Sequence, residues 1–311
     1  KSLGNGIDPL EVIDQYGADT LRFMLITGNT PGNDMRFYWE RVEATRNFAN
    51  KIWNASRFAL MNMEGYDANA KLAPYTLADK WILSRLQHTA KSVTEMLEKF
   101  ELGEAGRMIY DFIWGEVCDW YIELAKIRLQ KGGEPAQCAK RVLIYVMSNV
   151  LKLLHPFMPF VTEEIWQSLP HEGASIMVSD WPQYSDALNF SAEEEQMNMI
   201  MDAVRAIRNR RAEMNVPPSR KAQVILVTAQ PENYQLGAHF ITRMAYASEL
   251  TVLTAAPADL TGMVTVATHD ATVYMPMAEL VDIAKELERI ATERKKAEEN
   301  LQRIEAKLAN E

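Results

Sequence analysis

Apolar side chains recur every three to four residues through most of residues 38–167, and this is the period of an amphipathic helix. In the first such stretch, residues 39–63, the apolar positions include Val42, Phe48, Ile52, Ala55 and Leu60. The same period predicts further helices at about 76–100, 103–131, 138–154 and 161–169. Two prolines in the segment 155–159 separate the last two, because proline cannot continue a helix. Long helices joined by short connections predict an antiparallel helix bundle.

Three segments carry residue types that start helices. Asp8 before Pro9 is typical of an N-cap followed by a first helical position. Thr76 stands three residues before Asp79, which is the spacing of a capping box. A second capping box, Ser-Ala-Glu-Glu, is predicted to open a helix over residues 191–215.

The pattern changes after the two prolines at positions 217 and 218. A β-rich run, Ala-Gln-Val-Ile-Leu-Val, occupies residues 222–227. The segments that follow predict a helix at about 234–247 and strands near 250–254, 263–268 and 271–275. This mixture predicts a small α+β unit.

The tail of the chain has a third pattern. Its apolar residues fall on alternating steps of three and four, apart from Arg294 at one position of the series, and these residues are Leu280, Ile283, Leu287, Ile290, Ala297, Leu301, Ile304 and Leu308. Charged residues of both signs flank them, which is typical of a coiled-coil strand that is either truncated or pairs in trans. The predicted fold class is therefore mostly α: an antiparallel helix bundle with a small α+β subdomain and a C-terminal coiled-coil strand.

Composition excludes several classes of protein. The hydrophobic content of 48% supports buried cores, and no uninterrupted apolar stretch is long enough to predict a membrane span. The cysteines, Cys118 and Cys138, form no CxxC pair, and the five histidines show no HxxxH spacing, so no metal site is predicted. Free cysteines suit a reducing cytoplasm. The net charge of −9 argues against a nonspecific nucleic-acid binder and makes DNA an unexpected partner.

Polar residues on the first long helix share one face. Asn47, Lys51, Asn54 and Arg57 are separated by steps of three and four, and Arg46 lies beside them. Amides and cations in such a row are suited to reading unpaired RNA bases, whose edges are exposed in a single-stranded loop. The alternative is an ordinary solvated face.

A second polar cluster is strongly basic. Residues 205–221 contain six basic residues, among them Arg208 and Arg211, and a single acid, Glu213. Phosphate contact is one interpretation, and salt bridges to the acidic body of the protein are the other. The aromatic residues Trp114, Trp120, Tyr121 and Trp166 are interpreted as bundle core, whereas Trp53 is kept as a possible stacking platform for a base.

Several segments in order resemble the class I aminoacyl-tRNA synthetases for branched aliphatic amino acids. Lys1-Ser2-Leu3-Gly4-Asn5 resembles the second half of their Lys-Met-Ser-Lys-Ser loop, and a helix similar to theirs follows. The segments that resemble that helix and the helices of their anticodon-binding bundle are 16–22, 47–58, 119–123 and 154–166. The resemblance implies that the chain is the C-terminal part of a larger enzyme, with Lys1 and Ser2 as catalytic residues and Lys1 binding ATP.

The remainder of the chain resembles the valyl type of these synthetases. Residues 207–218 and the coiled-coil strand are similar to that type, and the cysteine-rich zinc module usual in isoleucyl relatives is absent. The resemblance implies a monomeric cytoplasmic enzyme that uses ATP and Mg²⁺ to attach valine to tRNA(Val). It assigns tRNA contacts to Arg46, Asn47, Lys51, Asn54, Arg57, Arg208 and Arg211. An isoleucyl enzyme and a non-catalytic helical adaptor remain alternatives.

The same resemblance divides the chain into four parts. Residues 1–37 are expected to end the catalytic domain, residues 38–190 to form the anticodon-binding bundle, residues 191–276 to form the α+β subdomain, and residues 277–311 to form the first strand of a coiled-coil arm. Without the rest of the catalytic domain, the fragment is expected to bind tRNA but not to catalyse, and to hold no cofactor.

Overall fold

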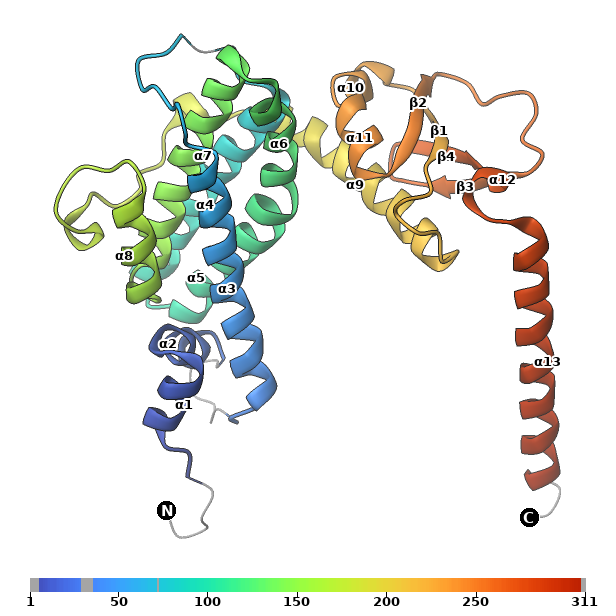
Figure 1. Ribbon diagram of the computed structural model, residues 1–311, viewed down its shortest axis with the longest axis horizontal. Helices are drawn as coiled ribbons and strands as arrows, with labels where there is room; N and C mark the ends of the chain where they lie inside the picture. Colours follow the sequence, from blue (N-terminus) through green and yellow to red (C-terminus); the bar gives the residue numbers. More distant parts are fainter. Residues whose placement is uncertain (1–5, 29–35, 72, 309–311) are drawn as a thin grey trace. The chain divides into compact units, whose positions relative to one another are not determined.

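The computed structural model describes residues 6–28, 36–71 and 73–308 of the chain (Figure 1). These residues form two compact units, 1–194 and 195–311, with the division close to the start of one helix. The fold is mostly helical, with one small mixed sheet in the second unit, which confirms the predicted fold class.

The first unit is built from helices. In chain order they are α1 (Pro9–Tyr16), α2 (Ala18–Thr27), α3 (Trp39–Met61), α4 (Leu77–Glu98), α5 (Leu102–Asp111), the π-helix η1 (Phe112–Tyr121), α6 (Ile122–Lys131), α7 (Gly133–Leu154), α8 (Pro159–Ser168) and two 3₁₀ turns, η2 (Ile176–Val178) and η3 (Asp186–Leu188). α3, α4, α7 and the run from α5 to α6 pack against one another as the bundle. α9 (Ser191–Glu213) begins at the end of this unit.

Two of the predicted helix starts are confirmed. The Asp8 side chain caps α1 by accepting the backbone N–H of Leu10, with Pro9 at the start of the helix. Thr76 and Asp79 form the capping box of α4, because each side chain bonds the backbone of the other. Both contacts satisfy N–H groups that have no partner within the helix.

The third predicted start has a different geometry. α9 does begin at Ser191, but the Ser191 hydroxyl donates to Asn189 Oδ1. The Glu194 carboxylate accepts the Ser84 hydroxyl of α4 and also lies near Arg85. Glu194 therefore holds the start of α9 against α4, and its carboxylate is not used in a capping box with Ser191.

The bundle has a core that lies mostly on α4 and α7. Trp81, Ile82, Leu143 and Met147 are among its most deeply buried side chains. One charged residue is enclosed with them: Asp79 is fully buried, and the Arg128 guanidinium reaches both of its carboxylate oxygens at 2.5 Å. The hydroxyl of Tyr121 donates to the same carboxylate at 2.9 Å. This cluster fixes α6 and η1 against the start of α4.

Two helix details differ from the sequence prediction. The predicted helix at 103–131 is interrupted by η1, where the backbone N–H of Ile122 bonds the carbonyl of Val117 five residues earlier. α7 begins at Gly133 rather than at residue 138, because Pro135 lies in its first turn, where a missing N–H costs no helical bond. The periodicity of apolar residues is the same on both sides of η1, so it did not reveal the π-helix.

The second unit packs helices on a four-stranded sheet. Its elements after α9 are β1 (Ala222–Thr228), α10 (Pro231–Gln235), α11 (Ala238–Met244), β2 (Ala247–Leu253), β3 (Met263–Ala267), β4 (Ala271–Pro276), α12 (Met277–Leu280) and α13 (Ile283–Leu308). The strand order is β2-β1-β4-β3. β1 and β2 are parallel, with Leu226 opposite Val252, and the other two pairs are antiparallel.

The connection from β1 to β2 differs from its prediction. One helix was expected over 234–247, and the structure has two short helices that meet near Gly237. A Cβ atom at Gly237 would lie 2.1 Å from Ile200 Cδ1 of α9, so the chain approaches α9 closely here and bends. On α13, the side chains of Leu287, Ile290, Leu301 and Ile304 are exposed, as the coiled-coil pattern requires of a strand without a partner.

Candidate nucleic-acid interface

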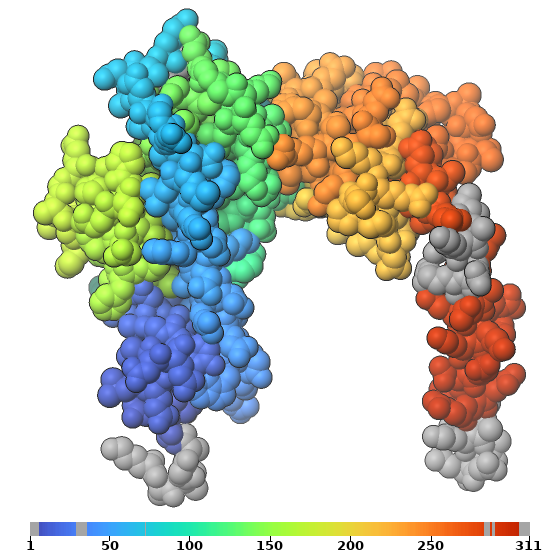
Figure 2. Space-filling view, in the orientation of Figure 1, coloured from blue at the N-terminus to red at the C-terminus, as the bar shows by residue number. Residues whose placement is uncertain are grey.

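The outer face of α3 carries an uncovered row of polar side chains. Asn47, Asn50, Asn54 and Arg57 follow one another at steps of three and four, and all are exposed. None of their side chains makes a hydrogen bond or ion pair with another residue in the part of the chain that the structure describes. The surface of α3 is open to solvent on the face drawn in Figure 2. We call these residues, together with Trp53, the α3 face.

Asn50 belongs to this row, in the place where the sequence predicted Lys51. Its position is three residues after Asn47 and four before Asn54, so the signal was the helical spacing itself. The α3 face thus offers three side-chain amides and one guanidinium, which together donate and accept hydrogen bonds in several directions.

Lys51 lies apart from this row. Its Nζ is 2.6 Å from Asp119 Oδ1 and 3.6 Å from the centroid of the Trp114 ring. Both partners are on η1, and the Trp114 ring is stacked on that of Tyr110. The ammonium is therefore held between α3 and η1 and does not extend from the α3 face. Its role in RNA contact stays a prediction that its placement does not favour.

Arg46 lies at the opposite end of the helix from Arg57. Its side chain is exposed, and its guanidinium carbon is 5.9 Å from the centroid of the Tyr16 ring. Tyr16 also lies beside Trp39, with ring centroids 5.9 Å apart. Arg46 therefore stands next to an aromatic cluster where α1 meets α3, beside Asn47 and about three turns of the helix before Arg57.

Most of the selected aromatic residues are core, as predicted. Trp120, Tyr121 and Trp166 are buried, and Trp114 is half-buried between α3 and η1. Trp53 differs from them, because 47% of its surface is exposed. It lies among the polar residues of the α3 face, between Asn50 and Arg57.

The basic segment of α9 is largely engaged within its own unit. Arg211 is only 3% exposed, and its guanidinium donates to the backbone carbonyls of Pro217 and Arg220. Arg208 donates from Nε to the carbonyl of Met244 at 2.7 Å. Both guanidinium carbons lie within 6 Å of the Tyr246 ring centroid, at 5.7 and 5.6 Å.

This placement gives Arg208 and Arg211 structural contacts. Burial lowers the pKa of Arg211, and no carboxylate is paired with it among the described residues. The basic pattern is open to phosphate contact or to salt bridges, and the resemblance assigns both residues to tRNA contact. Neither guanidinium is freely presented for such a contact, so this role stays a prediction. Arg205, Arg210 and Lys221 are exposed, and Arg210 is paired with Glu213 at 3.0 Å.

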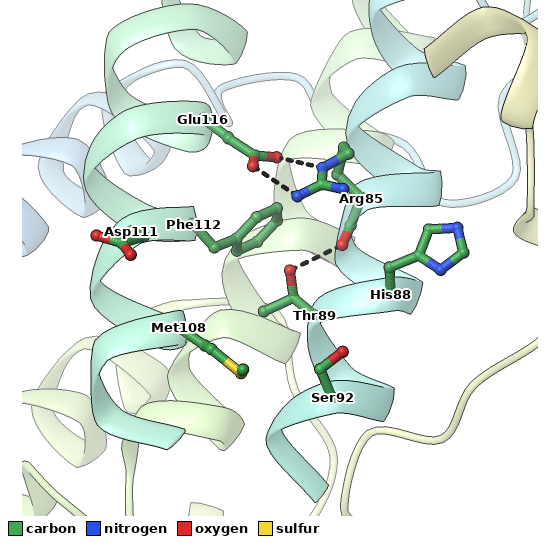
Figure 3. A pocket seen from close by; sticks show the side chains of 8 residues that line it. All are labelled: Arg85, His88, Thr89, Ser92, Met108, Asp111, Phe112 and Glu116. Atoms are coloured by element: carbon green, nitrogen blue, oxygen red, sulfur yellow. Dashed lines mark hydrogen bonds and ion pairs between the residues drawn. The ribbon is translucent and has the colours of Figure 1, made fainter. Parts of the chain in front are cut away.

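A cleft between α4 and the α5–η1 run was not anticipated from the sequence. It encloses about 280 Å³, and Figure 3 shows Arg85 and Glu116 facing each other across it. Two hydrogen bonds of 2.9 Å join them, and the bond to Glu116 is the main reason that the pKa of Arg85 is raised. Glu194 also lies 3.5 Å from this guanidinium. The cation of the cleft is therefore already neutralised, which makes the cleft a poor site for phosphate.

Other chemistry finds little support in the described residues. They contain no group of three or more His, Cys, Asp or Glu side chains that could hold a metal ion. Burial raises the pKa of Cys118 to about 11, so its thiol stays protonated and unreactive near neutral pH. Lys1 and Ser2 lie outside the described residues. None of the helices that the structure describes is long and apolar enough to cross a membrane.

Comparisons with known proteins agree with this picture. Residues 79–226 match the family described as "Anticodon-binding domain of tRNA ligase", and residues 1–38 match "tRNA synthetases class I (I, L, M and V)". The chain therefore belongs to the class I tRNA ligases, and the greater part of its bundle is their anticodon-binding domain. This membership removes the helical adaptor from consideration.

Among the relatives that match along the whole chain are valine–tRNA ligases. The chain is 50% identical over 316 residues to that of Clostridium acetobutylicum and 50% identical over 318 residues to that of Geobacillus stearothermophilus. Each alignment covers 100% of this chain and 36% of the relative, so the chain spans about a third of their length. A crystal structure of a LeuRS–tRNA–LeuAMS ternary complex from Agrobacterium radiobacter aligns with a TM-score of 0.47 and 18% identity, covering 73% of this chain and 24% of that chain.

Proposed function

We propose that the α3 face binds the unpaired bases of a tRNA anticodon loop, as part of an enzyme that attaches valine to tRNA(Val). The observation that carries this proposal is the exposed row of Asn47, Asn50, Asn54 and Arg57, whose hydrogen-bonding groups have no described partner. Unpaired bases present their edges to such groups, whereas base-paired RNA hides them in a narrow groove.

The relatives support the proposed identity of the tRNA. The two valine–tRNA ligases match the chain over its full length, which favours tRNA(Val) over the isoleucine tRNA of the alternative. The intact enzyme would form a valyl-adenylate from ATP with Mg²⁺, act as a monomer in the cytoplasm, and use Lys1 and Ser2 at its ATP site. The chain by itself is expected to bind tRNA without catalysing adenylate formation.

A phosphate-holding surface at the end of α9 and just before β1 is a second part of the proposal. Since Arg208 and Arg211 are engaged with backbone carbonyls, this part rests on Arg210 and Lys221, which are exposed. Such contacts fix position on the RNA and carry no sequence information. We therefore expect α9 to contribute affinity that depends on salt, and the α3 face to contribute selectivity.

Fluorescence titration of the chain with three RNAs tests the proposal: valine tRNA, isoleucine tRNA, and valine tRNA with a substituted anticodon. We expect tighter binding to the first. We also expect Asn54→Ala and Arg57→Ala each to reduce this preference by about 10-fold or more, which is typical of a lost side-chain contact to a base. Arg107→Ala is the matched control, because Arg107 is an exposed arginine on α5 that is paired with Glu104. Equal binding of all three RNAs by the unsubstituted chain would overturn the role of the α3 face.

A further inference from the structure

Trp53 differs from the other exposed tryptophan of α3. Both indoles are exposed to a similar degree, 47% for Trp53 and 45% for Trp39. Trp39 nevertheless packs against two rings, with centroid distances of 5.1 Å to Phe37 and 5.9 Å to Tyr16. No ring, cation or hydrogen-bond acceptor among the described residues contacts Trp53. The exposed indole of Trp53 therefore has no packing role within the first unit like that of Trp39.

The neighbours of Trp53 are suited to RNA rather than to an apolar partner. Asn50 precedes it by three residues and Arg57 follows it by four, so the three side chains lie along one stripe of the helix. Asn54 lies next to this stripe. An aromatic face beside amides and a guanidinium matches the recognition of single-stranded bases, which stack on aromatic rings and form hydrogen bonds through their edges.

We propose that Trp53 is the stacking platform for one unpaired base of the anticodon loop, and that Asn54 and Arg57 read base edges beside it. This inference rests on the proposed function of the α3 face. Stacking depends little on the identity of the base, because every base has a π face. Hydrogen bonds to base edges do depend on it. Trp53 therefore supplies affinity, and its polar neighbours supply selectivity.

This division of roles makes a measurable distinction. Removing the ring by Trp53→Ala is expected to weaken binding to every anticodon-loop sequence by the same factor, about 5- to 100-fold. Trp53→Phe keeps an aromatic face and is expected to retain most of the affinity. Asn54→Ala and Arg57→Ala are expected to lower the preference for one loop sequence over another.

The experiment uses the whole chain and three RNA probes. They are a hairpin with the anticodon arm of valine tRNA, the same hairpin with substituted anticodon bases, and a blunt duplex of the same stem without a loop. Trp53→Ala should weaken both hairpins equally and leave the duplex unchanged. Trp39→Ala is the matched control, since it removes an equally exposed indole about 21 Å away along the same helix. Quenching of tryptophan emission by the hairpin should be smaller in Trp53→Phe than in the unsubstituted chain.

The outcomes separate the inference from the function on which it rests. If Asn54→Ala and Arg57→Ala reduce the preference while Trp53→Ala changes nothing, the stacking role is overturned and the function of the α3 face stands. If none of the three substitutions changes binding, the proposed function itself is overturned. An equal loss with the duplex, or an equal loss in Trp39→Ala, would overturn the assignment of stacking to Trp53.

Discussion

The carboxylate of Asp19 accepts the backbone N–H of Val161 at 2.7 Å, although the two residues are 142 positions apart in the chain. It also accepts the N–H of Phe160 at 3.3 Å. Asp19 is on α2, and both N–H groups are in the first turn of α8, where a helix has no partners of its own. Asp19 therefore caps α8 from another helix.

Arg22 strengthens the same junction. It lies one turn after Asp19 on α2 and donates to the carbonyls of Pro156 at 3.1 Å and Phe157 at 3.3 Å. The segments 16–22 and 154–166, which resemble synthetase motifs in the sequence, are therefore in direct contact. Residues 1–38 match the class I tRNA synthetase family and residues 79–226 match the anticodon-binding domain, so this junction joins the two matched segments.

Replacing Asp19 with Ala should destabilise the first unit. The loss is expected to be about 1–2 kcal/mol, at the upper end for an N-cap, because Asp19 is only 9% exposed and the N–H groups of α8 would lose their acceptor. The midpoint of urea unfolding, followed by circular dichroism, measures the change. Asp8→Ala is the control, since Asp8 caps the exposed start of α1. A smaller shift for Asp19→Ala than for Asp8→Ala would contradict the importance of the junction.

The buried pair of Asp79 and Arg128 should be costly to break from either side. Asp79→Ala leaves the guanidinium without its partner in the bundle core, and a loss of about 3–5 kcal/mol is expected for an uncompensated buried charge. The double substitution with Arg128→Met should cost less than the sum of the single changes, because it removes both charges together. A double-mutant cycle in chemical denaturation gives this coupling. Strict additivity would mean that the pair contributes no interaction energy.

The sequence predicted the structural contacts between residues that are close together in the chain, and it missed contacts between residues that are far apart. Helix periods, the cap at Asp8 and the capping box at Thr76 involve residues within four positions of each other, and the sequence predicted them. The exposed row on α3 was also predictable, because helical spacing alone places those residues on one face. The sequence did not reveal Asp19 as the cap of α8, since its partners are on a helix far along the chain.

The structure does not favour three of the predicted RNA contacts, and Lys51 and Arg211 show why the sequence pattern was insufficient. Lys51 shares the helical spacing of the α3 face, yet Asp119, 68 positions later, holds its ammonium. Arg211 belongs to a basic run, yet backbone carbonyls and a tyrosine enclose it. Spacing and charge identify which residues are candidates for binding, and only tertiary packing shows which of them remain available.

Lowering the pH should weaken the hydrogen bonds by which Glu163 holds the loop after α8 against that helix. Its carboxylate accepts hydrogen bonds from Gln167 at 2.7 Å, Ser175 at 2.8 Å and the N–H of Ile176 at 3.2 Å. These bonds, first that from Gln167, lower the pKa of Glu163. A carboxyl whose pKa is lower in the folded state stabilises the protein fully above its unfolded pKa of about 4.3, and this contribution disappears as the pH falls through the folded value.

The corresponding measurement is the thermal midpoint of the chain and of Glu163→Gln between about pH 7 and pH 3. The difference between them should be largest near neutral pH and should shrink below about pH 4. Glu164→Gln is the control at the neighbouring, exposed position. His155 also titrates within this range, because burial lowers the pKa of its imidazole below the usual value near 6.5, and the Glu164→Gln control shows its contribution. A difference that is constant with pH would show that the charge of Glu163 is unimportant.

Arg211 should be required for the stability of the second unit rather than for RNA contact. Arg211→Ala removes the donors to the carbonyls of Pro217 and Arg220, and buried acceptors without partners cost about 1–3 kcal/mol. Arg211→Lys should restore little, because one ammonium cannot reproduce the geometry of the guanidinium, which also lies over the Tyr246 ring.

Arg210→Ala, at the adjacent exposed position, should change the unfolding midpoint little and should reduce the salt dependence of tRNA binding instead. Both variants can be compared by denaturant unfolding and by titration across a salt series. Weakened tRNA binding by Arg211→Ala with an unchanged unfolding midpoint would show that its guanidinium serves the RNA directly.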